Sequence, residues 1–175
     1  THRLERPLRM DYRKLPDYKE RLGAFEWALP DDLHSDNFTG DLAAWWIKKY
    51  APIDEPIFLQ IGFPGPHPPY DPTRSAIEQY EGRDIPVRAV NDADTQSQPA
   101  AFDALRRRSV ELEADAIAYS LEPSLESRKR QRACYLANVT MIDKKVGDIL
   151  AALEAKGLLE NSIVMFTSDH GDTLG

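Results

Sequence analysis

The sequence contains one cysteine, no long apolar run and no excess of basic residues, and each of these shortages excludes a class of protein. A single Cys134 cannot form an internal disulfide framework. No apolar stretch approaches the roughly 20 residues of a transmembrane helix, so we expect no membrane partner. A formal net charge of −7 argues against a nucleic-acid partner. The first residues lack an initiator methionine and an apolar leader, so we expect an internal segment of a longer protein, whose compartment stays open.

The composition is otherwise typical of a folded domain. Hydrophobic residues make up 42% and charged residues 29% of the 175 positions, which is enough for one domain with a core. Residues 1–35 are polar, with scattered aromatic residues and no sustained period, and predict an irregular lead-in to a larger body. Basic runs at 106–108 and 128–132 lie in helical stretches rich in acidic residues, which indicates solvated helix faces.

Apolar spacing and capping signals predict four helices, over residues 40–50, 73–80, 100–119 and 125–156. Thr39 can cap the first of them, and Gly157 is well placed to end the last. In the last helix the apolar residues recur at steps of 4, 3, 4, 3 and 4, so they share one face. They are Tyr135, Val139, Ile142, Val146, Ile149 and Leu153.

Two short apolar runs predict buried β-strands. They are "IFLQIGF" at 57–63 and "IVMFTS" at 163–168, and the long helical stretch between them is the layout of a βαβ unit. We therefore expect an α/β fold with a central, mostly parallel sheet, helices on both of its faces, and only part of that sheet within this chain. In such sheets, ligands bind beyond the carboxyl ends of the strands.

Polar residues follow both predicted strands at their carboxyl ends. His67 lies in a proline-rich loop after the first strand, where rigid presentation suits a proton donor, although a structural histidine bonded to a backbone carbonyl fits equally well. Asp169 and His170 follow the second strand beside Gly171, and a carboxylate with an imidazole suits a divalent cation. The alternative for Asp169 is the cap of a following helix.

Two further features carry weaker signals. Cys134 lies inside the longest predicted helix without a histidine near it in sequence, which favours a small core residue over a nucleophile. The stretch "PDDLH" at 30–34 is the best candidate for a second cluster of metal ligands. No predicted strand leads into it, however, which makes it a weak candidate.

Two separated stretches resemble the sulfatase family of the alkaline phosphatase superfamily. They are "FLQIGFPGPHPPYDP" at 58–72 and the stretch from "RACYLANV" to "SDHGDTLG" at 132–175. The Ser-Asp-His-Gly form is similar to the branch of phosphonate monoester hydrolases and related arylsulfatases. The resemblance implies one sulfatase-like α/β domain, of which residues 1–175 are an internal segment and 82–127 a variable insert.

The resemblance also implies site roles. Asp169 and His170 would be ligands of one divalent metal, Ca²⁺ or Mn²⁺, and His67 would contact the leaving group or a substrate oxygen. The family's formylglycine nucleophile, made from the cysteine of a Cys-x-Pro-Ser-Arg segment, is expected outside this chain, because Cys134 is followed by Tyr-Leu-Ala. The same holds for the aspartate pair that completes the metal site.

The sequence therefore predicts a segment of a hydrolase that acts on a small anionic substrate: a sulfate, phosphonate or phosphate ester. The segment alone is expected to be inactive, and exposed sheet edges would favour homo-oligomers. Two alternatives stay open. One is a two-metal phosphodiesterase or phosphotransferase of the same superfamily with a Thr or Ser nucleophile, and the other is a catalytically dead binding module.

Overall fold

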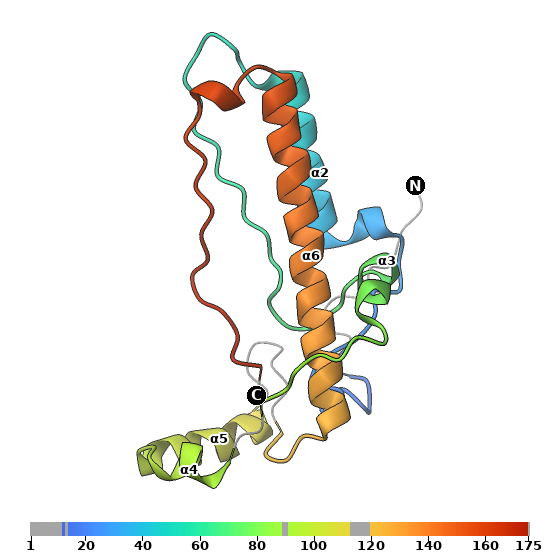
Figure 1. Cartoon of the computed structure of the whole chain (residues 1–175), viewed down its shortest axis with the longest axis vertical. Helices are drawn as coiled ribbons and strands as arrows, with labels where there is room; N and C mark the ends of the chain where they lie inside the picture. The colour runs from blue at the N-terminus through green and yellow to red at the C-terminus, as the bar shows by residue number, and fades with distance from the viewer. Residues whose placement is uncertain (1–11, 13, 89–90, 113–119, 175) are drawn as a thin grey trace.

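The computed structural model describes residues 12, 14–88, 91–112 and 120–174, and its regular elements are helical (Figure 1). In chain order they are η1 (Asp31–Leu33), α2 (Ser35–Tyr50), α3 (Arg74–Ile77), η2 (Glu78–Tyr80), α4 (Asp92–Gln96), α5 (Ala100–Leu112), α6 (Leu125–Ala155) and η4 (Leu159–Asn161). Among the described residues, no helix is both long and apolar enough to cross a membrane.

The longest helix, α6, agrees with the predicted one to within a residue at each end. Ser124 caps it by accepting a hydrogen bond from the amide of Ser127. Gly157 follows its last turn at φ 73°, a left-handed conformation that glycine adopts without steric penalty. Helix α2 differs from its prediction, because it begins at Ser35 rather than beyond Thr39, and its cap is the side chain of His34, which accepts from the amide of Asp36.

The C-terminal half of α6 packs against α2, and the two helices run side by side (Figure 1). Their buried interface consists of small and β-branched side chains: Ala43, Ala44, Ile47 and Ala51 on one side, Ile149 and Ala152 on the other. The backbones approach closely at Gly40, where an added Cβ would lie 2.5 Å from the Cβ of Lys145. The ammonium of Lys145 then reaches Asp41 at 2.6 Å.

The N-terminal half of α6 buries a second core. Cys134, Ala137 and Met141 of α6 pack there with Tyr70 and Ile77. The prediction for Cys134 is confirmed: its side chain is fully buried, and burial raises the pKa of the thiol to about 11. A thiol held in its protonated form is a poor nucleophile.

The described part of the predicted lead-in, residues 12 and 14–34, is largely irregular and well packed. Tyr12 and Tyr18 stack on Phe25. Residues 23–27 run parallel to 70–72, with hydrogen bonds from the amides of Tyr70, Phe25 and Trp27 to carbonyls of the opposite segment at 2.8–2.9 Å. This short ladder attaches the chain after the proline-rich loop to the second core.

The two predicted strands are extended, but neither is paired within the described residues, so the predicted sheet is not confirmed. In Figure 1 they run apart from each other along one side of α6. Ile57, Ile61 and Phe63 pack against the α2–α6 core while Phe58 is 93% exposed, so the first run has the alternation of a strand covered on one face. The second run is exposed throughout, at 93% for Ile163. An apolar run predicts a strand, but a strand forms only where a neighbour receives its hydrogen bonds.

The remaining helix predictions are mostly confirmed. The helix predicted at 73–80 is α3 with η2, and the short α4 lies within the stretch 82–127 that was expected to be an insert. The helix predicted at 100–119 is α5, while 113–119 lie outside the described residues. The basic run at 106–108 is ion-paired within α5, where Arg106 and Arg107 both contact Asp103. In the run at 128–132, Gln131 is buried rather than solvated.

The close contact at Gly40 gives a stability prediction. We expect Gly40→Ala to destabilise the fold by about 1–3 kcal/mol, because the new methyl group overlaps the stem of Lys145 rather than its mobile end. The measurement is the free energy of unfolding in urea. Gly147→Ala is the matched control, because nothing lies within 4 Å of its added Cβ. It replaces a glycine within a helix, so it should stabilise the fold by about 0.5–1 kcal/mol. Equal effects of the two changes would contradict the packing described.

Candidate functional site

The loop after the first apolar run and the segment after the second meet in the folded chain. The hydroxyl of Tyr70, three residues beyond His67, donates a hydrogen bond to the carboxylate of Asp172 at 3.0 Å. Leu174 also packs against the second core. The two stretches singled out from the sequence are thus joined across 102 positions of the chain.

His67 is partly buried within the loop, which four prolines stiffen. Its Nδ1 lies 2.7 Å from the carbonyl oxygen of Pro68. A carbonyl can only accept, so this contact assigns the ring proton to Nδ1 and leaves Nε2 as the reactive nitrogen. The carbonyl bond expected of a structural histidine is therefore present. It also keeps a proton on Nδ1 and orients the ring, so that Nε2 is the nitrogen that would gain and release a proton.

Asp169 and His170 lie at the surface, with side chains 87% and 74% exposed. A carboxylate oxygen of Asp169 accepts the amide of His170 at 2.9 Å, and this backbone bond, helped by the imidazole charge, lowers the pKa of the carboxyl. Nδ1 of His170 lies 3.1 Å from the carbonyl of Gly171, which raises the pKa of the imidazole, as does the charge of Asp169. The described residues that follow Asp169, up to 174, contain no helix.

The donors of this pair fit a divalent cation. The carboxylate of Asp169 is held in its charged form, and Nδ1 of His170 donates to a backbone carbonyl, which leaves Nε2 with a lone pair for a metal. Nε2 lies 3.7 Å from the second carboxylate oxygen of Asp169. The pair is not a full ligand set: among the residues that the structure describes, no group of three or more His, Cys, Asp or Glu side chains could hold a metal.

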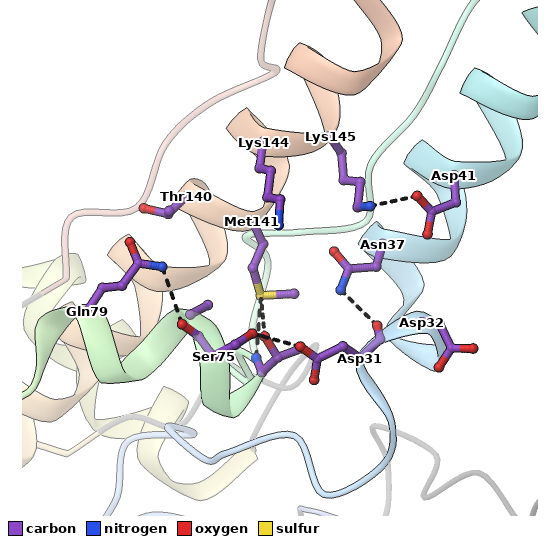
Figure 2. A pocket seen from close by; sticks show the side chains of 12 residues that line it. Asp31, Asp32, Asn37, Asp41, Ser75, Gln79, Thr140, Met141, Lys144 and Lys145 are labelled. Atoms are coloured by element: carbon purple, nitrogen blue, oxygen red, sulfur yellow. Dashed lines mark hydrogen bonds and ion pairs between the residues drawn. The ribbon is translucent and has the colours of Figure 1, made fainter. Parts of the chain in front are cut away.

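The cluster at 30–34 does not converge on a metal. Asp31 and Asp32 line a polar cavity between α2, α3 and α6, which Figure 2 shows, and none of the predicted site residues lines it. Asp31 accepts a hydrogen bond from Ser75 at 2.7 Å and Lys145 reaches Asp41, so polar groups around the cavity engage one another. His34, by contrast, is buried and does not line the cavity.

A buried polar group that sequence reasoning missed lies behind the loop of His67. His34, Asp36 and Asp71 are 1%, 0% and 0% exposed. His34 places Nδ1 3.7 Å from Asp36 and Nε2 3.6 Å from Asp71. In the sequence, His34 stood out only as the last residue of the 30–34 stretch. That Asp71 meets it depends on how the loop returns to α2.

Comparisons with known proteins agree with these motifs. A family model described as Sulfatase matches residues 6–175. The chain is 28% identical over 149 residues to an arylsulfatase of Clostridium perfringens, an alignment that covers 85% of this chain and 29% of the relative. It is 31% identical over 154 residues to the multifunctional alkaline phosphatase superfamily protein PehA of Trinickia caryophylli, covering 84% of this chain and 29% of the relative.

A choline-sulfatase of Rhizobium meliloti is 28% identical over 125 residues, or 69% of this chain and 22% of the relative. The chain thus spans less than a third of the length of the relatives it matches. The family model, however, extends over nearly the whole chain and includes both the loop of His67 and the Ser-Asp-His-Gly segment. The chain belongs to the sulfatase family of hydrolases.

Proposed function

We propose that this chain is the central segment of a longer hydrolase that cleaves sulfate or phosphonate esters. The observation that carries the proposal is the hydrogen bond between Tyr70 and Asp172. It joins the loop of His67, which would supply the proton donor, to the segment of Asp169 and His170, which would supply the metal ligands. Family membership and the relatives named arylsulfatase and choline-sulfatase support the same chemistry.

In the longer protein, residues 57–63 and 163–168 would be strands of a mostly parallel sheet. Their length, their apolar sequence and the one-sided packing of Ile57, Ile61 and Phe63 support this assignment. Further strands would come from regions such as those that the longer relatives possess. Without such neighbours, the exposed runs would promote self-association. The partner expected of the isolated segment is therefore a second copy of itself.

His67 would protonate the departing alcohol or phenol. The bond from Nδ1 to Pro68 orients the ring, and in the protonated form Nε2–H would donate to the ester oxygen as its bond to sulfur or phosphorus breaks. The stiff loop limits the freedom of the ring before reaction, which lowers the entropic part of the barrier.

Asp169 and His170 would hold a divalent cation, through a carboxylate oxygen and Nε2. The hydrogen bond from Nδ1 of His170 to the carbonyl of Gly171 keeps Nε2 available. The hydrogen bond from the backbone amide of His170 to the carboxylate of Asp169 favours the charged form of that carboxylate. A bound Ca²⁺ or Mn²⁺ would supply Lewis-acid stabilisation of developing negative charge. The nucleophile, a formylglycine hydrate, would come from another part of the protein.

The proton-donor role predicts a selective loss of activity. In the complete enzyme, His67→Gln should lower kcat/KM for aryl sulfates by roughly 10²–10⁴-fold when the phenol is a poor leaving group, and much less when it is a good one. The measurement is kcat/KM over a series of aryl sulfates with leaving groups of graded pKa. A loss of the same size for every ester would contradict the role, because a good leaving group needs no proton.

The ligand role predicts a loss of bound metal. Asp169→Ala and His170→Ala should each lower the metal content of the purified complete enzyme, and its activity, by at least tenfold. Metal per protein is measured by plasma mass spectrometry after dialysis. Glu160→Gln is the matched control, since it removes an exposed carboxylate of the same C-terminal stretch and should leave the metal content unchanged.

The nucleophile decides between the proposed enzyme and its alternatives. Peptide mapping of the complete gene product should find an aldehyde in place of one cysteine side chain outside this chain. An unmodified Ser or Thr at the reactive position, with two metals bound, would favour the phosphodiesterase or phosphotransferase. A complete product that holds no metal and turns over neither a sulfate nor a phosphonate ester would be a binding module.

A further inference from the structure

The loop that carries His67 lies against the start of α2 at both of its ends. At the entry, the amide of Gly65 donates to a carboxylate oxygen of Asp36 at 2.9 Å. At the exit, Asp71 faces Nε2 of His34 at 3.6 Å. Two residues of one helix start, His34 and Asp36, therefore lie against the two ends of a loop some thirty residues further along the chain.

The side chains at this contact lie close together and away from solvent. His34, Asp36 and Asp71 are all buried, and a buried carboxylate is costly unless it is bonded or paired. The amide of Asp36 donates to Nδ1 of His34 at 3.2 Å, which assigns the ring proton to Nε2, on the side of Asp71. Asp36 is also the acidic residue in the first turn of α2, where the helix dipole favours negative charge.

Gly65 fits against Asp36 because it has no side chain. A Cβ added there would lie 3.0 Å from the carboxylate carbon of Asp36 and would overlap the nearer oxygen. The backbone at position 65 therefore lies close to the carboxylate of Asp36, and a larger residue at this position must displace either the loop backbone or that carboxylate.

We propose that Asp36, held by His34, is a positioning residue that sets the place of the His67 imidazole through its hydrogen bond to Gly65. Only Pro66 separates Gly65 from His67, and prolines follow on the other side, so the loop has few torsions in which to absorb a shift at its entry. A displacement at Gly65 is therefore transmitted to the ring. This inference rests on the proposed role of His67 as proton donor.

The attachment can be measured without any activity. Residues 64, 66, 68 and 69 are prolines, so the segment 64–70 has only the backbone amides of Gly65, His67 and Tyr70. In hydrogen–deuterium exchange of the complete protein, Asp36→Ala should expose the amide of Gly65 and speed its exchange about tenfold or more. The amide of Tyr70, bonded to Gly23 at 2.8 Å, is the internal reference and should change little.

The kinetic test compares three changes in the complete enzyme. Asp36→Ala should lower kcat by about 10–100-fold, with KM changed far less, and the loss should be greatest for poor leaving groups, as for His67→Gln. Asp36→Asn should recover most of the activity, because its amide oxygen can still accept from Gly65. Asp41→Ala removes an exposed carboxylate of the same helix and is the control that leaves kcat unchanged.

A double-mutant cycle tests the contact itself. Gly65→Ala should slow the reaction strongly in the native background but add little once Asp36→Ala has removed the opposing carboxylate. This variant also covers the case in which Asp36→Ala fails to fold, since it alters the loop and leaves α2 intact.

Each contrary result is distinct. Equal effects of Gly65→Ala in both backgrounds, or an Asp36→Asn enzyme as slow as Asp36→Ala, would overturn the positioning role. A loss that is uniform over leaving groups would show that Asp36 does not act through His67. If the complete protein hydrolysed no ester, the proposed function would fail, whereas the exchange of the Gly65 amide would still decide whether Asp36 holds the loop.

Discussion

The packing of α6 against two separate bodies is the constraint on which the rest of this structure depends. Its C-terminal half lies on α2 through small side chains, and its N-terminal half covers Tyr70 and Ile77. A helix of 31 residues is a rigid rod, so it keeps these two cores in register. The loop of His67 lies between them, because the chain leaves the α2–α6 core at Phe63 and enters the second core at Tyr70.

That placement explains why polar groups gather behind the loop. The start of α2 presents His34 and Asp36 where the loop begins and ends, and both are buried there. A proline-rich loop has few backbone amides that can donate hydrogen bonds. Apolar packing alone would therefore let the whole loop shift relative to the helices. The hydrogen bond from Gly65 to Asp36 and the ladder between 23–27 and 70–72 supply directional contacts at its two ends.

The helices were predictable because their signals are local. The bounds of α6 follow from apolar spacing, a serine cap and a terminal glycine, all of which lie within a few residues of the feature they set. The start of α2 was missed for a related reason: His34 is an unusual cap, and Ser35 and Asp36 were passed over in favour of Thr39. The strands at 57–63 and 163–168 depend on neighbours, so their sequence predicts their extended shape but not their pairing.

By itself the sequence determined the long helix α6, the burial of Cys134 and the two motifs that mark the family, because each depends on spacing along the chain. Only the tertiary structure decided that Tyr70 bonds Asp172 and that His34 and Asp36 meet Asp71 and Gly65. Those contacts join positions far apart in sequence. Their partners are selected by how α6 brings the two cores together, which no local pattern of residues encodes.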